Sequence, residues 1–255
     1  MKKTILITVA FLTICCLACK ESTNTVTPTT TGTTNGTNYG TLMQKAFSDY
    51  GNKSVTTSID GNYLVVTTTT VPDHKSPYFA TNNAQYEAYN GTGTFAKAPN
   101  TITSGNITFK IPISPTKATT AQATPMGPIG VSINGVPFFN QYAAGGSPLT
   151  NEILGFDQYG GHPQQQGQYH YHLEPFFITA AKGKGILLGF LTDGFPVYGS
   201  LENGKTVATK DLDAYHGHSH TTTEYPNGIY HYHITSDDPY INGSGYYGTP
   251  GTVSK

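Results

Sequence analysis

An internal repeat constrains the fold of this chain more than any other feature of its 255 residues. The first copy covers about residues 128–176 and the second about residues 187–240. Residues 130–139 read GVSINGVPFF and residues 189–198 read GFLTDGFPVY, so Gly, an Asn or Asp, a second Gly, Pro and an aromatic residue recur at the same spacing. Two copies are too few for a solenoid, which needs at least three. The sequence therefore predicts a pseudo-twofold arrangement of paired sheets within one domain.

The two copies also match towards their ends, where each carries a Tyr-His-Tyr-His segment. The equivalent positions are Asp157 and Asp213, Tyr159 and Tyr215, Gly161 and Gly217, His162 and His218, and residues 169–172 and 230–233. Six of the nine histidines thus form two matched triplets, which are His162, His170 and His172 in the first copy and His218, His231 and His233 in the second.

The rest of the chain indicates a mainly β fold. Only 11% of the residues are charged, while Gly and Pro occupy 29 and 16 positions, a composition that disfavours long charged helices and coiled coils. Residues 54–59 and 63–71 are rich in β-branched side chains and flank an Asp-Gly turn, which predicts a hairpin. Residues 106–113 alternate between apolar and polar side chains, as a half-buried strand does. Asn134-Gly135 and Asp193-Gly194 predict tight hairpin turns.

Helical patterns are few and short. They fall at residues 42–47, 148–156 and 176–182. The strand count and the density of turn residues together predict a sandwich or barrel-like domain with an internal pseudo-twofold repeat.

Residues 1–18 have the pattern of a secretory signal, with a short basic stretch followed by about a dozen apolar residues, too few for a spanning helix. The segment Leu17-Ala18-Cys19 resembles the lipobox of bacterial lipoproteins, and this resemblance implies that Cys19 is lipidated after cleavage. An ordinary cleaved signal that leaves a free thiol is the alternative. We therefore expect a protein of the bacterial cell envelope that is anchored in membrane lipid, at the outer membrane or the cell surface.

The segment after Cys19 consists almost wholly of Thr, Asn, Gly and Pro, which cannot bury apolar surface. We expect residues 19–40 to be the lipidated cysteine and a disordered tether, and residues 41–255 to form the β domain. Cys15 and Cys16 lie inside the signal, so the mature domain has no disulfide.

The charge pattern excludes nucleic acid as a partner. The formal net charge is −1, and removal of Lys2 and Lys3 with the signal leaves 12 lysines against 15 acids, or −3. The chain has no arginine, and its lysines are scattered singly rather than clustered. Protein partners cannot be read from the sequence.

The histidine pattern predicts a metal centre in each copy. Because side chains alternate along a strand, His170 and His172 share one face at a separation of about 6.6 Å, while Tyr169 and Tyr171 point to the other face. His231 and His233 repeat this geometry. A third imidazole, from His162 or His218, would come from the preceding loop. Three imidazoles leave an open position for water or substrate.

Other polar residues near these segments have predicted roles too. Asp157 and Asp213 are candidates for second-shell acceptors that fix an imidazole tautomer, or for direct ligands. His216 and His220 are additional candidate ligands in the second copy. The alternative is an amphipathic strand whose imidazoles bond only to the backbone.

The paired Tyr-His-Tyr-His segments, the DGFPVYG segment at residues 193–199 and the VPDH segment at residues 71–74 resemble the YHYH-motif protein family, over roughly residues 55–245. The resemblance implies that His74 belongs to the same set of histidines. It carries over no established activity.

Ligand chemistry favours copper slightly over zinc, because imidazole and carboxylate are present while the mature chain has no thiolate and only Met43 and Met126 as thioethers.

Three functions remain open. The first is a lipid-anchored protein that binds the metal for capture or homeostasis. The second is an extracellular metalloenzyme, a hydrolase or oxidoreductase, with Asp157 or Asp213 as the base. The third is a surface adhesion module that the metal only stabilises.

Overall fold

The structure is a computed structural model that describes residues 36–243 and 245–255. The predicted signal at residues 1–18, Cys19 and most of the predicted tether lie outside the described residues. The first described element is helix α1 (Gly36–Tyr50), which begins before the end of the predicted tether and is longer than the helix predicted at residues 42–47.

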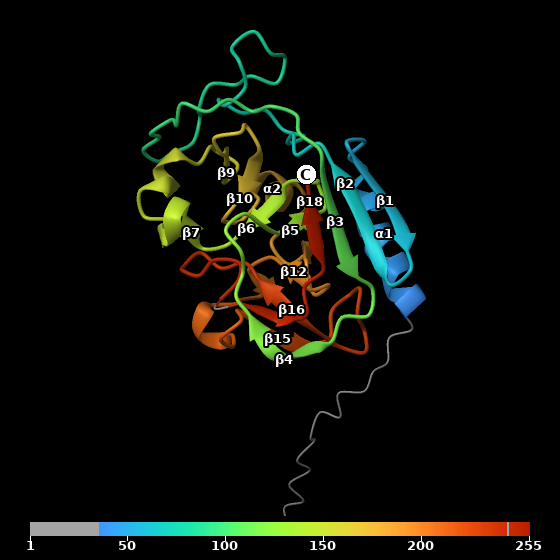
Figure 1. Ribbon diagram of the computed structural model, residues 1–255. Coiled ribbons are helices and arrows are strands. Elements are labelled where there is room, and N and C mark those ends of the chain that lie inside the picture. Colours follow the sequence, from blue (N-terminus) through green and yellow to red (C-terminus); the bar gives the residue numbers. More distant parts are fainter. Residues whose placement is uncertain (1–35, 244) are drawn as a thin grey trace, which may run out of the picture. The chain divides into compact units, whose positions relative to one another are not determined.

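A four-stranded antiparallel sheet follows α1, in the order β1-β2-β3-β18. Its strands are β1 (Val55–Asp60), β2 (Tyr63–Thr68), β3 (Ile107–Pro112) and β18 (Thr252–Ser254). Asp60 pairs with Tyr63 across the turn, so the hairpin is confirmed, although β2 ends three residues before the predicted Val71. The C-terminal strand β18 pairs with β3 and forms one edge of this sheet (Figure 1).

The second sheet has eight strands in the order β15-β16-β12-β11-β5-β6-β10-β9. The first copy supplies β5 (Pro128–Ser132), β6 (Pro137–Phe139), β9 (Gly161–Pro163) and β10 (Tyr169–Tyr171). The second copy supplies β11 (Leu187–Leu191), β12 (Pro196–Tyr198), β15 (Gly217–His220) and β16 (Ile229–His233).

The strand order reads as a palindrome around the antiparallel pair β5 and β11, in which Val131 is opposite Phe190. The pseudo-twofold repeat is therefore confirmed, but the prediction of paired sheets is wrong in one respect. Both copies belong to a single sheet, because the first strands of the two copies pair with each other. Gly130 and Gly189 allow this contact, since a Cβ at either position would collide with the backbone of the facing strand.

Three further two-stranded pairs and four short helical segments complete the described part of the chain. The pairs are β4 (Lys117–Gln122) with β17 (Tyr246–Gly248), β7 (Tyr142–Ala143) with β8 (Ser147–Pro148), and β13 (Leu201–Glu202) with β14 (Lys205–Thr206). The helical segments are α2 (Phe176–Lys182), η1 (Ala144–Gly146), η2 (Glu152–Gly155) and η3 (Thr209–Asp211). The helix predicted at 176–182 is confirmed as α2, whereas the one predicted at 148–156 is only the 3₁₀ turn η2.

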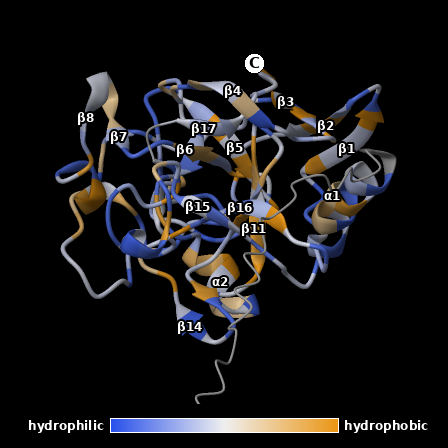
Figure 2. Ribbon diagram, turned by 90° about the horizontal axis from the view of Figure 1, so that it is seen from below, coloured by the Kyte–Doolittle hydropathy of each residue, from blue (hydrophilic) through white to orange (hydrophobic). Residues whose placement is uncertain are grey.

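Two buried clusters lie on the two faces of the large sheet. One contains the tyrosines of β10 and β16 together with Phe138, Val197 and Ile178 of α2. The other joins Val131 and Phe190 of the central strands to α1 and to the four-stranded sheet. Figure 2 shows apolar residues along α1, α2 and β11. The prediction of a mainly β domain is confirmed, and of its two alternatives the open, packed sheets of the described residues fit the sandwich, since they form no closed barrel.

Within the described residues, neither α-helix has the length and apolar character that crossing a membrane requires.

Candidate metal centres

The Tyr-His-Tyr-His segment of the first copy follows the predicted alternation. Tyr169 and Tyr171 are fully buried in the core on one face of the large sheet. His170 and His172 point to the opposite face, where the ring of Phe139 stacks on His170 with 3.9 Å between ring centroids. The alternation places two imidazoles side by side, with their Nε2 atoms 3.0 Å apart.

The third histidine of each triplet lies on an edge strand rather than in a loop, which corrects the prediction. His162 of β9 is directly opposite His170, and His218 of β15 is directly opposite His231. The glycine before each histidine permits the close pairing. A Cβ on Gly161 would lie 2.6 Å from the carbonyl oxygen of His170, and a Cβ on Gly217 would collide with that of His231.

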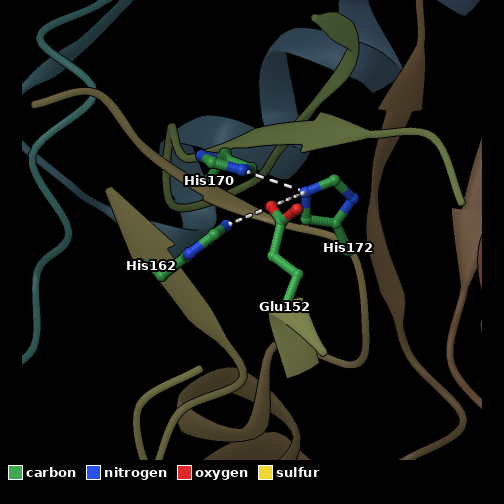
Figure 3. Close-up of side chains that lie close together, drawn as sticks. All are labelled: Glu152, His162, His170 and His172. Atoms are coloured by element: carbon green, nitrogen blue, oxygen red, sulfur yellow. Dashed lines mark hydrogen bonds and ion pairs between the residues drawn. The ribbon is translucent and has the colours of Figure 1, made fainter. Parts of the chain in front are cut away.

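The first site consists of Glu152, His162, His170 and His172, whose candidate ligand atoms all lie within 4.8 Å of one another (Figure 3). Glu152 comes from η2, and its carboxylate lies between the rings of His162 and His172. Its Oε1 lies 3.0 Å from Nε2 of His162 and 3.6 Å from Nε2 of His172. One carboxylate and three imidazoles thus surround a single point.

The second site repeats this arrangement with Glu202, His218, His231 and His233. The Nε2 atom of His233 lies 3.1 Å from that of His231 and 3.1 Å from that of His218. Glu202 Oε1 is 3.3 Å from Nε2 of His231. Glu202 belongs to β13.

The hydrogen bonds of the rings identify which nitrogens can bind a cation. Nδ1 of His170 faces the carbonyl oxygen of Gln168, and Nδ1 of His172 faces that of Asn140. A carbonyl oxygen accepts only, so each Nδ1 carries the proton and each neutral ring presents an Nε2 lone pair. Two lone pairs at 3.0 Å cannot hydrogen bond to each other. The two lone pairs repel each other, whereas a cation bound between them would attract both.

The rings of the second site also present unprotonated Nε2 atoms, because Nδ1 of His231 faces the carbonyl oxygen of Ile229 and Nδ1 of His233 faces that of Gly199. Two nitrogens bound to one ion at 2.0–2.1 Å are about 2.8 to 3.4 Å apart, for angles from square-planar to tetrahedral. The separations of 3.0 and 3.1 Å at the two sites fall in this range.

The rings resist protonation, so a proton does not readily occupy the place between them. Burial lowers the pKa of His172 and of His233 to about 4, and it lowers the pKa of His170, His231 and His218 as well. At neutral pH the rings are therefore uncharged, which is the form that binds metal. Burial alone would raise the pKa of Glu152, but the hydrogen bond from His162 and the other neighbouring imidazole lower this pKa overall, so the carboxylate is ionised.

The two sites are too far apart to share an ion. Five strand intervals separate β10 from β16 in the large sheet, which corresponds to about 24 Å along the sheet. Each site therefore could hold one ion of its own.

The sequence prediction missed both glutamates. Glu152 lies thirteen residues after Phe139, whereas Glu202 lies only four residues after the equivalent Tyr198. Because the two copies differ in length here, alignment does not pair these acids. The sequence signal was only that each interval between the Pro-aromatic segment and the following Gly-His contains one glutamate among its acidic residues.

The predicted tautomer-fixing role of Asp157 and Asp213 is wrong. Asp157 accepts hydrogen bonds from Ser76 and Tyr169, and Asp213 accepts one from Tyr230, so both carboxylates belong to the tyrosine face. The backbone carbonyls described above orient the imidazoles instead.

The three additional candidate histidines differ in position. His74 is buried away from both sites, with Nε2 3.3 Å from the hydroxyl of Tyr171. His216 is also buried outside the second site, and its Nε2 lies 2.9 Å from Oγ1 of Thr235. His220 does adjoin the second site, where its Nδ1 is 2.7 Å from Oε2 of Glu202.

The family model described as "YHYH protein" matches residues 108–206 and 201–245, together more than half of the chain. The chain belongs to the YHYH protein family. The match covers all eight strands of the large sheet and every residue of both sites, so the resemblance read from the motifs is confirmed. His74, which that resemblance implied as a ligand, lies before the matched residues of this YHYH protein. Searches of curated proteins and of solved structures found no match.

Proposed function

We propose that this YHYH protein is a lipid-anchored, extracytoplasmic protein that binds transition-metal ions, with copper slightly favoured over zinc. The observation that carries the proposal is the meeting of Nε2 lone pairs at 3.0 to 3.1 Å in two separate three-histidine, one-glutamate sites. A fold that needed only hydrogen-bonded imidazoles would not bring unprotonated nitrogens together twice.

The donor set supports copper(II) or zinc. Imidazole suits both ions, and copper(II) binds a given set of nitrogen and oxygen ligands more tightly than zinc does. A calcium site would instead consist of oxygen ligands, and here three of the four donors are nitrogens.

A metal analysis tests this proposal. Protein exported to the periplasm under metal-replete conditions is expected to copurify with about two equivalents of transition metal. The variant His170→Ala/His172→Ala should retain one equivalent, and the combined His170→Ala/His172→Ala/His231→Ala/His233→Ala variant none. A parent protein without metal, confirmed as folded by circular dichroism, would refute the proposal.

The buried histidines could be needed for folding, so milder variants complement this experiment. Glu152→Gln and Glu202→Gln alter side chains at the partly exposed margin of each site and preserve their size. Each should lower the metal content at its own site only.

The lipid anchor is a separate part of the proposal and depends on the lipobox-like segment that ends at Cys19. Mass spectrometry of the mature amino terminus is expected to find a lipid-modified Cys19. Cys19→Ala should release the protein from the membrane fraction. An unmodified Cys19 would remove the anchor but leave the metal proposal intact.

A His-ligated metalloenzyme is the second candidate, and a pocket of about 620 Å³ that adjoins the first site favours it. Asp157 and Asp213 lie on the tyrosine face and cannot serve as its base. Glu152 is the carboxylate within reach of the histidines.

A further inference from the structure

The two metal sites differ in their surroundings, although their donors match. All four donor residues of the first site, Glu152, His162, His170 and His172, line the pocket of about 620 Å³. This volume lies within the range of about 300–1,000 Å³ that small-molecule sites occupy. Nε2 of His162 is buried there and lies 3.0 Å from Oε1 of Glu152. An ion at the first site would thus have a pocket beside it.

The lining of this pocket has a distinct chemistry. Glu152 is its only charged side chain among the described residues, and the amides of Asn100, Asn151, Gln164 and Gln165 line it as well. Amides both donate and accept hydrogen bonds, as hydroxyl groups on a ligand require. The lining includes no lysine, and the chain has no arginine to pair with an anionic group.

An exposed aromatic ring completes the lining. Tyr142 of β7 is 42% exposed, so its ring offers a flat apolar surface at the pocket. The ring of Phe139 is already covered by His170. An aromatic platform beside several amides suits a ligand with hydroxyl groups on its edges and an apolar face.

The second site has an additional imidazole at the position equivalent to Gln164. His220 follows His218 by two residues, as Gln164 follows His162. The His220 ring stacks on His218 at 4.4 Å between centroids, and its Nδ1 bonds to Glu202. The second site can therefore draw a fifth donor from its own chain, whereas Gln164 instead donates to Gln168.

We infer that the first site is a ligand-binding metal centre, in which an uncharged ligand of carbohydrate type occupies the pocket and reaches the ion with a hydroxyl or amide oxygen. The second site holds its ion with its own residues. This inference rests on the proposed function, because it requires an ion at each site.

The test compares two proteins that each retain one site. Glu202→Gln combined with His231→Ala leaves the first site, and Glu152→Gln combined with His170→Ala leaves the second. Each is loaded with copper(II) and titrated with azide, which produces a charge-transfer band when it binds copper directly. We expect the band in the protein with the first site, and at least about tenfold weaker azide binding in the other. Equal azide binding by both would overturn the assigned difference.

The ligand class is tested on the protein with the first site. Neutral probes, cellobiose and N,N′-diacetylchitobiose, are compared with digalacturonic acid by calorimetry and by the copper(II) spectrum. Binding of a neutral probe that also shifts the spectrum supports the inference. Binding of the acidic probe alone, or of none of the three, would overturn the ligand class. If neither protein retains copper, the proposed function has failed instead, and metal analysis separates the two results.

Tyr142→Ala provides a variant outside the metal ligands. Loss of the ring should weaken binding of the neutral probe about tenfold without changing the copper content. The matched control is Tyr63→Ala on β2, a tyrosine that is 41% exposed and does not line the pocket. Equal weakening in both variants would contradict a role for the pocket.

Discussion

Acid should destabilise the metal-free protein far more than the metal-loaded protein. Burial lowers the pKa of His172 and of His233 to about 4, whereas an unfolded histidine titrates near 6.5. Between these values the unfolded chain binds protons that the folded chain rejects, so stability falls as the pH falls. From pH 7 to pH 5 the loss is about 2 kcal/mol for each ring, or about 4 kcal/mol for both. A bound ion should oppose this loss, because the protons must first displace it.

The assay is urea unfolding at pH 7, 6 and 5, followed by circular dichroism, with EDTA or with copper(II). The loss of about 4 kcal/mol from these two rings alone moves the midpoint by about 2 M if the slope is about 2 kcal/mol per molar urea, and His216, whose pKa burial also lowers to about 4, adds about half as much again. His233→Asn should reduce the loss by about 2 kcal/mol and remove the second metal ion.

His216→Asn is the matched control. Burial lowers the pKa of His216 to about 4 as well, but this ring lies outside the second site. Its backbone has φ of 71°, a conformation that asparagine tolerates. The variant should reduce the acid sensitivity equally and keep both ions. A metal-free parent with the same midpoint at pH 7 and pH 5 would refute the reasoning.

Three further predictions concern single side chains. Glu152→Gln should weaken copper binding at the first site by about 100-fold and leave the second unchanged, as a competition titration with a copper chelator would measure. Gly217→Ala should lower the free energy of unfolding by about 1–3 kcal/mol and lower the metal content of the second site, because the added Cβ collides with the His231 carbonyl and the Tyr230 ring. Gly105→Ala, with open space around its Cβ, is the control for both measurements. Asp157→Asn should lower stability by about 1–3 kcal/mol in urea unfolding, since the carboxylate accepts bonds from Ser76, Tyr169 and the Tyr159 amide. Its metal content should not change, and loss of metal would restore a role for Asp157 at the site.

Local patterns predicted the elements that contain the histidines. Side chains alternate along residues 169–172 and 230–233, so once one face of the strand is buried, the tyrosines and histidines must lie on opposite faces. The tyrosines are the side chains that lie in the buried core. The Asn134-Gly135 and Asp193-Gly194 turns have positive φ at the glycine, as their sequences predict.

Contacts between distant segments were harder to predict. Gly130 and Gly189 recur in both copies, but only the structure shows that they allow the first strands of the two copies to pair. Glu152 and Glu202 reach equivalent places from a 3₁₀ turn and from a short hairpin, and no shared spacing links them. Asp157 and Asp213 matched in the alignment because each accepts a hydrogen bond from the first tyrosine of its own Tyr-His-Tyr-His segment.

The palindromic strand order puts β9 and β15 at the two outer edges of the large sheet. An unpaired strand edge is a template on which another chain can add a strand. Each of these short edge strands carries one histidine of a site whose other histidines lie in the neighbouring strand or, for His172, directly after it. An ion at each site would hold both edge strands to their neighbours, so removal of the metal is expected to make self-association through these edges easier.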